Sequence, residues 1–341
     1  MIDLRSDTVT APSRAMRTAM AEAAVGDDVF GEDPTVLELQ VETARLVGKA
    51  AGLYVPSGTM SNQLAIKSHT DPADEMICEA GAHIMNYESG GPAFHSQVQL
   101  HPLQGNLGVF TAEQVEEAIR PRNVHQPPTR LIAIENTHNR AGGTIFPLEE
   151  IHRIHDVAER HGVQLHLDGA RLLNAVVATG IPAHEWAEPF DSVSICLSKG
   201  LGAPVGSVLC GSETFIERAH RYRKLFGGGM RQAGIIAAGG LYALRHHVDD
   251  LRWDHERARR LAQTLNRLPG IEVNADDVHT NIVIFDVDDQ KGSGAEIEER
   301  LKRAGLLCLA FARHKIRLVT HRDLTDTDID QAIQIFQKVL A

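Results

Sequence analysis

One lysine stands where the sequence changes from an apolar run to a turn of small residues. Residues 191–197 predict a buried strand, Ser198 and Lys199 follow it, and residues 205–210 predict the next strand. A lysine at such a place loses hydration unless it is paired or used covalently. Burial also favours the neutral amine, which is the form that makes a Schiff base. Lys199 is therefore a candidate for covalent catalysis, and a side chain that simply extends to solvent is the alternative.

Three further groups could act with this lysine. Ser57-Gly58-Thr59 precedes a predicted helix, whose free amides and dipole suit a phosphate, although an ordinary N-cap is the alternative. Asp168 ends a predicted strand, where a cap or turn role is the alternative, and His83 follows another strand. Pyridoxal phosphate needs an amine, an anion near its ring nitrogen, a phosphate cradle and a group against its ring. Together, the four groups predict a pyridoxal phosphate site.

The predicted elements would bring these residues to one edge of a sheet. Strands at 75–79, 98–103, 130–135 and 163–168 alternate with helices up to about residue 210. This alternation predicts a mostly parallel sheet with helices on both faces. Ligands of such sheets bind beyond the carboxyl ends of the strands, where Asp168 and Lys199 are expected and which His83 just follows.

The pattern changes near residue 247. Beyond it, strands at 271–273, 281–287 and 315–320 mix with helices at 295–303 and 326–340. We therefore expect a large cofactor-binding domain at 1–247, with an N-terminal arm at 1–33, and a smaller α+β domain at 248–341.

Composition excludes several classes of function. The 341 residues carry a net charge of −11 and have no arginine-rich tract, which argues against a nucleic-acid-binding protein. The charged N-terminus is unlike a signal peptide, and apolar runs are too short for a membrane span. The four cysteines are scattered and form no C-x-x-C pair, which favours a reducing, cytoplasmic location and no zinc site.

Ordered motifs along the whole chain make the sequence recognisable. It resembles the low-specificity L-threonine aldolases, which have the aspartate-aminotransferase-like fold (fold type I) of pyridoxal-phosphate enzymes. The stretches that carry the resemblance are LRSDTVT at 4–10, GDDVFGEDP at 26–34, PSGTMSN at 56–62, HIMNYESGG at 83–91, ENTHN at 135–139, HLDGAR at 166–171, SKGLGAP at 198–204 and GGGMRQ at 227–232.

The resemblance implies roles at the cofactor. The implied residues are the Schiff-base lysine Lys199, the ring-nitrogen partner Asp168, the phosphate binders Gly58 and Thr59, the stacking residue His83, and Arg171 and Lys224 beside the cofactor. Lys224 would reach the phosphate of a neighbouring subunit, because family members are typically homotetramers, dimers of dimers with shared active sites.

The resemblance also implies a reaction and its substrate-binding residues. The reaction is retro-aldol cleavage of L-threonine, L-allo-threonine and other L-β-hydroxy-α-amino acids to glycine and an aldehyde. Ser6, Arg171 and Arg313 would hold the substrate carboxylate, for which an arginine fork is suited. His83 and His125 would lie near the hydroxyl as candidates for proton transfer, with His125 in less distinctive surroundings.

Other functions remain open on the residues alone. Another fold-type-I lyase, which eliminates at the β-carbon and releases ammonia, would use the same lysine and aspartate. A dehydrogenase is disfavoured because Gly292-Ser-Gly294 lacks the third glycine of a dinucleotide-binding motif. His152 and His155 have no third ligand nearby, so no metal site is expected.

Overall fold

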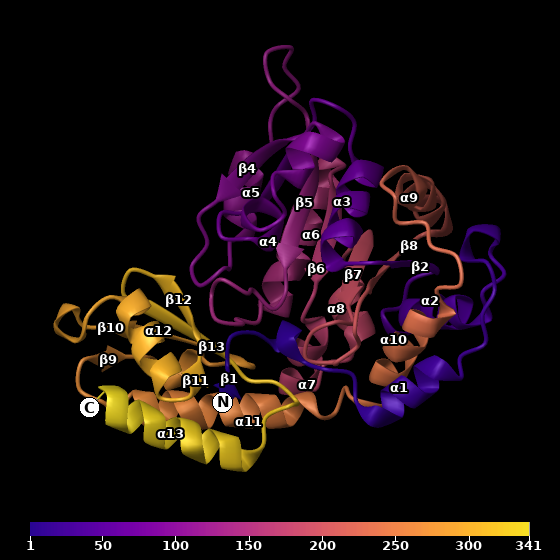
Figure 1. The fold of residues 1–341 in the computed structure, drawn as a ribbon. Coiled ribbons are helices and arrows are strands. Elements are labelled where there is room, and N and C mark those ends of the chain that lie inside the picture. The colour runs from indigo at the N-terminus through magenta and orange to yellow at the C-terminus, as the bar shows by residue number, and fades with distance from the viewer. Residues whose placement is uncertain (341) are drawn as a thin grey trace.

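A seven-stranded sheet forms the centre of the computed structural model, which describes residues 1–340 (Figure 1). In spatial order its strands are β2 (Ala51–Val55), β8 (Ser207–Gly211), β7 (Ser192–Cys196), β6 (Gln164–Gly169), β5 (Thr129–Glu135), β3 (Glu75–Glu79) and β4 (Gln99–Leu103). β8 runs antiparallel to both of its neighbours, and the remaining pairs are parallel. The predicted mostly parallel sheet is therefore present.

Helices cover both faces of this sheet, and the strands alternate between them. Leu53 and Val55 of β2 pack with α3 (Gly58–His69) and α9 (Glu213–Leu225), whereas Tyr54 faces the larger core on the opposite side. That larger core also receives residues of α1 (Arg14–Ala21), α2 (Pro34–Leu46), α5 (Ala112–Ala118), α6 (Leu148–His161), α7 (Leu172–Thr179), α8 (Ala183–Ala187) and α10 (Gly234–His246).

On the α3 side, the middle of the sheet is polar. Leu165 and Leu167 of β6 belong to the larger core, so the alternate residues His166 and Asp168 point to the other face. There His166 contacts Asn62 of α3, and Ser194 of β7 donates a hydrogen bond to Ser61 of the same helix. Strand periodicity thus buries the candidate Asp168 between the sheet and α3.

A second, smaller sheet lies beside the first domain (Figure 1, orange and yellow). Its strands in order are β12 (Leu309–Ala312), β13 (Lys315–Val319), β10 (Ile282–Val287) and β9 (Ile271–Glu272), and it packs on α11 (Leu251–Leu265), α12 (Gly294–Arg303) and α13 (Asp326–Leu340). α11 is the first helix of this second unit along the chain.

The N-terminal arm differs from its expected place. β1 (Ile2–Asp3) pairs in parallel with β11 (Leu306–Leu307), and Ile2 and Leu4 pack in the core of the small domain. The arm then crosses to the large domain, where Asp7 binds Arg171. The chain therefore links both domains at its first residues, and the expected 1–247 domain does not include its own start.

No helix among residues 1–340 has the length and apolar character needed to cross a membrane.

Candidate active site

Asp168 and Lys199 lie at the carboxyl ends of the neighbouring strands β6 and β7. Asp168 is the fifth residue of β6 and is paired with Ser194, and Lys199 follows the end of β7 by three residues. Asp168 is 2% exposed and Lys199 is half-buried. The two side chains that were predicted to bind the cofactor's ring nitrogen and aldehyde therefore come from adjacent strand ends, as the parallel sheet requires.

Buried donors hold the Asp168 carboxylate in place. Its Oδ2 accepts a hydrogen bond from Asn62 Nδ2 at 2.8 Å, and its Oδ1 accepts one from the backbone N–H of Ala170 at 3.2 Å. The arrangement suits an anion that faces a protonated ring nitrogen.

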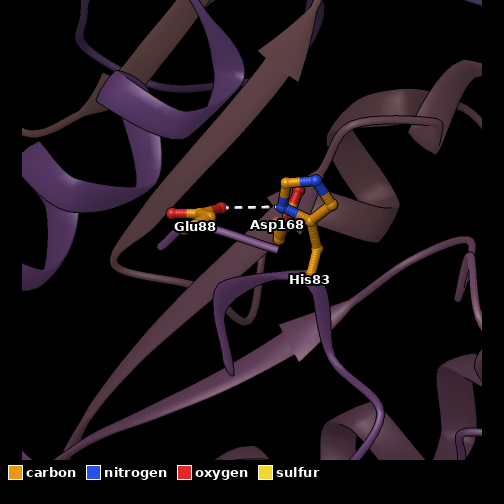
Figure 2. A group of neighbouring side chains, drawn as sticks. All are labelled: His83, Glu88 and Asp168. Carbon is orange, nitrogen blue, oxygen red and sulfur yellow. Dashed lines mark hydrogen bonds and ion pairs between the residues drawn. The ribbon is translucent and has the colours of Figure 1, made fainter. Parts of the chain in front are cut away.

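His83, at the start of α4 (His83–Asn86), lies close to this carboxylate (Figure 2). Its Nδ1 is 2.9 Å from Oε1 of the buried Glu88, and its backbone N–H donates to Oε2 of Glu135 at 2.7 Å. Burial lowers the pKa of His83, but the hydrogen bond to Glu88 and the negative charges of Asp168 and Glu88 outweigh burial, so that the pKa lies above its ordinary value. With Nδ1 held by Glu88, Nε2 is the nitrogen left to act on a ligand.

The same three residues could hold a metal ion by distance alone. One ligand atom each from His83, Glu88 and Asp168 lies within 4.8 Å of the other two. However, Asn62 Nδ2 donates to both Glu88 and Asp168, so an N–H group already lies between the two carboxylates. The three residues are therefore already satisfied as a hydrogen-bonded group.

The predicted phosphate seat is the start of α3. Ser57 caps the helix by accepting from Met60 N–H at 3.2 Å, which leaves the amides of Gly58 and Thr59 pointing from a helix N-terminus. A Cβ at Gly58 would lie 3.5 Å from Ser207 Oγ, a buried hydroxyl without a hydrogen-bond partner among the described residues. The exposed Thr59 and this free hydroxyl are the donors that a phosphate would use.

Arg171 reaches the site but is already paired. Its Nε and Nη2 donate to the two oxygens of Asp7, both at 2.7 Å, and both side chains are buried. Burial raises the pKa of Asp7, but Arg171 and the nearby charge of Lys199 outweigh it and hold the pKa well below its usual range. Ser6, the neighbour of Asp7, is half-buried and accepts hydrogen bonds from Thr8. The expected carboxylate fork of Arg171 is thus occupied by Asp7.

Arg313 does not join this group, and a different arginine does. Arg313 is exposed in the turn between β12 and β13, whereas Arg317, in the middle of β13, is 8% exposed. Burial and the charge of Arg171 lower the pKa of Arg317, and its Nε has no hydrogen-bond partner among the described residues. Strand alternation explains the difference, because Arg317 opposes Ile284 inside the sheet while the turn points outward. Arg317, and not Arg313, is thus the buried arginine near Arg171.

Two other expected residues lie outside the group within one chain. His125 is exposed in the loop before β5, at the amino end of that strand, while Glu135 ends it near His83. A strand of this length separates its ends by about 20 Å at roughly 3.3 Å per residue. Lys224 is exposed in the last turn of α9. Within one chain, His125 therefore lies far from Glu135 and His83.

Sequence reasoning missed several residues of the site. Four of them lie inside stretches already quoted for the resemblance: Asp7, Asn62, Glu88 and Glu135. The feature that could have identified them is that each is a polar residue in one of these stretches and had no role assigned to it. The signal for Arg317 was a charge in the otherwise apolar run Ile316–Val319.

Comparisons with known proteins show the family of the chain. Residues 3–288 match the family model described as beta-eliminating lyase. The chain is 44% identical to low-specificity L-threonine aldolase 1 of Arabidopsis thaliana, over 99% of this chain and 96% of the relative. It is 42% identical to the low specificity L-threonine aldolase of Escherichia coli K12, over 100% of both chains.

The fold has a solved counterpart as well. The structure of Leishmania major threonine aldolase superposes with a TM-score of 0.84 at 19% identity, over 100% of both chains. At this identity the likeness shows the fold, and it confirms the expected aspartate-aminotransferase-like fold of the pyridoxal-phosphate enzymes. By the family model and the extent of its sequence identity, the chain belongs to the low-specificity L-threonine aldolases, within the beta-eliminating lyase family.

Proposed function

We propose that this protein is a carbon–carbon lyase that cleaves L-threonine, L-allo-threonine and related L-β-hydroxy-α-amino acids to glycine and an aldehyde with pyridoxal 5′-phosphate. The observation that carries the proposal is that Asp168 and Lys199 lie at adjacent strand ends of the large sheet, with the unpaired Arg317 of the small domain close enough to Arg171 for their charges to interact. The chain also has full-length threonine aldolase relatives. An anion, an amine and a carboxylate-binding cation are the groups that the reaction needs.

The residues present fit the cofactor. Lys199 would bind its aldehyde, Asp168 its ring nitrogen, and the start of α3 at Gly58 and Thr59 its phosphate. When bound, the cofactor supplies a protonated ring that accepts the electron pair released as the Cα–Cβ bond breaks. Asp168, held by Asn62, would supply the anion for that ring nitrogen, and His83 would pack on the ring.

Arg317 is the side chain that we assign to the substrate carboxylate. A buried guanidinium without a partner is costly, and a planar carboxylate would satisfy it with two parallel hydrogen bonds. Arg171 lies close enough for its charge to act on Arg317, and Asp7 locks it in place. Ser6, next to Asp7, would donate its hydroxyl to the same carboxylate. Fixing the carboxylate sets the angle between the Cα–Cβ bond and the cofactor ring, on which cleavage depends.

His83 is the base that we assign to the substrate hydroxyl. Glu88 binds Nδ1, so the neutral ring presents the lone pair of Nε2 to the ligand. Removal of the hydroxyl proton by Nε2 would start the cleavage of the Cα–Cβ bond, and such help accelerates reactions by about 10²–10⁴-fold. Because the pKa of His83 is raised, the enzyme should lose activity as the pH falls through that value.

His125 and Lys224 fit the proposal only as residues of a neighbouring subunit. Both are exposed, and Leu225, beside Lys224, is 71% exposed. Phe94 and Phe30 are also exposed, at 80% and 73%, and such apolar side chains are typical of subunit contacts. We therefore propose a homotetramer with shared active sites, in which these two residues complete a neighbour's site.

A cytoplasmic location is part of the proposal too. The four cysteines Cys78, Cys196, Cys210 and Cys308 are all buried and unpaired, which suits a reducing compartment.

The cofactor assignment is tested by replacing the lysine. We expect purified protein with added pyridoxal phosphate to show the visible absorbance band of an imine, and Lys199→Ala to lose both the band and nearly all turnover. Lys302→Ala, at an exposed lysine of α12, is the control and should keep both. An unchanged band in Lys199→Ala would reject the assignment.

The family description keeps a β-eliminating reaction as the second candidate. It would convert threonine to ammonia and a 2-oxo acid rather than to glycine and acetaldehyde. Identification of the products therefore separates the two reactions.

A further inference from the structure

Asn62 lies at the centre of the polar network beneath the proposed cofactor site. This residue of α3 is 2% exposed. Its Nδ2 donates to Oδ2 of Asp168 and to Oε1 of Glu88, both at 2.8 Å. A side-chain amide nitrogen carries two hydrogens, so both are in use. The two acceptors have separate tasks in the proposed function, since Asp168 faces the ring nitrogen and Glu88 orients His83.

A chain of buried hydrogen bonds fixes the orientation of this amide. Asn62 Oδ1 is 3.1 Å from His166 Nε2, and His166 Nδ1 is 2.9 Å from Ser192 Oγ. Burial lowers the pKa of His166 to about 4, more than Asp168 raises it, so the ring is neutral at pH 7. Because Nδ2 must donate to carboxylates, Oδ1 is an acceptor, Nε2 of His166 carries the proton, and Nδ1 accepts from Ser192.

The chain continues to His69 at the end of α3. His69 Nε2 is 2.8 Å from Ser192 Oγ, and burial lowers the pKa of His69 to about 3. The single hydroxyl hydrogen of Ser192 is used toward His166, so Ser192 accepts from His69. Every donor in the chain from His69 to Asn62 therefore points toward the carboxylates of Asp168 and Glu88. If the Asn62 amide were flipped, its oxygen would face both carboxylates and no hydrogen bond would form.

We propose that Asn62 is a positioning residue that couples the cofactor-holding Asp168 to the His83-holding Glu88. The inference rests on the proposed function. Two neighbouring carboxylates repel each other unless a proton or a donor lies between them. The amide supplies one N–H to each without adding charge, and so holds both carboxylates in fixed positions. Around Asn62 the ionisable groups are Asp168 and His166 of β6, Glu88, and His83 behind Glu88.

The neighbouring residue provides a matched control. Gln63 is also 2% exposed on α3, and its Nε2 donates to Oε2 of Glu88 at 2.6 Å. No hydrogen bond joins it to Asp168 among those of the described residues. Replacement of Gln63 therefore removes a buried amide and a bond to Glu88, but leaves the bond to Asp168.

The test measures the dissociation constant of pyridoxal phosphate by titration of the apo-protein without substrate. Asn62→Leu should raise this constant about tenfold or more, the scale of one hydrogen bond to a buried charge. Gln63→Leu should keep it within about twofold of wild type. An unchanged constant in Asn62→Leu, or equal increases in both variants, would overturn the coupling.

Asn62→Asp provides a second measurement, a pH dependence of cofactor binding, which would not change if Asn62 had only a structural role. The introduced carboxyl repels Asp168 when ionised and can donate to it when protonated. We therefore compare the dissociation constant of pyridoxal phosphate in Asn62→Asp with that in Asn62→Leu. The ratio of the two constants should fall as the pH is lowered from 8 to 6, and a ratio independent of pH would contradict the proposal. If Asn62→Leu does not fold, the pH dependence of Asn62→Asp relative to wild type decides. Wild-type protein that fails to bind pyridoxal phosphate would instead reject the proposed function.

Discussion

Two corners of the active site treat buried charge differently. At the ring corner, the carboxylates of Asp168 and Glu88 accept hydrogen bonds from Asn62, and Glu88 also holds His83. At the carboxylate corner, Arg171 is bound by Asp7, but Arg317 keeps a buried Nε without a partner among the described residues. Both carboxylates of the ring corner have their donors as the chain folds, whereas the carboxylate corner has one cationic donor group left over.

This difference distinguishes the paired residues, which keep the site in place, from Arg317, which is free to bind a ligand. Buried polar groups are almost always paired, so an unpaired buried cation is evidence of a function. The fully paired groups, by contrast, fix positions that the cofactor needs before it binds.

Asp7→Asn should destabilise the protein most. It leaves Arg171 buried without its counter-charge, and loss of one partner of a buried pair costs about 3–5 kcal/mol. Unfolding in urea at pH 7 measures this loss. Because the pKa of Asp7 is depressed by folding, its contribution is present above the ordinary aspartate range and is lost as the pH falls through the folded pKa. The difference in the free energy of unfolding between wild type and Asp7→Asn should therefore become smaller below about pH 4.

Asp3→Asn is the control for that experiment. Asp3 pairs with Arg5 at 2.6 Å, but the arginine side chain is 46% exposed. Such surface pairs contribute less than about 1 kcal/mol. Equal losses in the two variants would mean that the Asp7–Arg171 pair has no special weight.

Arg317→Leu should have the opposite effect on stability. Removal of an unpaired buried charge should leave the free energy of unfolding unchanged or raise it. The KM for L-threonine should nevertheless rise by about 10²-fold, the upper range for a hydrogen bond to a charged group. Arg313→Leu should change neither quantity, because Arg313 is exposed in its turn. A large KM effect at Arg313 and none at Arg317 would restore the assignment made from the sequence.

Glu88→Gln should move the pH dependence of the reaction. Glu88 is the main group that raises the pKa of His83 against the effect of burial, and the base must be neutral. Loss of the carboxylate lowers that pKa, so the acid limb of kcat/KM should move to lower pH by about one unit. Glu116→Gln, which removes an exposed carboxylate from His161, should leave the limb in place. A limb that stays in place in Glu88→Gln would identify a different base.

The sequence predicted the elements that carry strong periodicity and the residues at their ends. Strands β3 to β7 and the strand-end residues Asp168 and Lys199 were expected from alternation and turn signals. The pairing of Asp7 with Arg171 was not, because it joins positions 164 residues apart, and no local pattern encodes such a contact. The same holds for the pairing of β1 with β11, which joins Ile2 to Leu306, far along the chain.

Arg313 shows a different kind of error. Both arginines lie within five residues, and the motif did not decide which one enters the sheet. The strand register decides it, because Arg317 opposes Ile284 while Arg313 precedes the strand.

The most direct test of the account is product analysis with L-threonine as substrate and pyridoxal phosphate as cofactor. The account predicts one glycine and one acetaldehyde for each threonine consumed. Ammonia and a 2-oxo acid in their place would contradict it and assign the same lysine and aspartate to β-elimination.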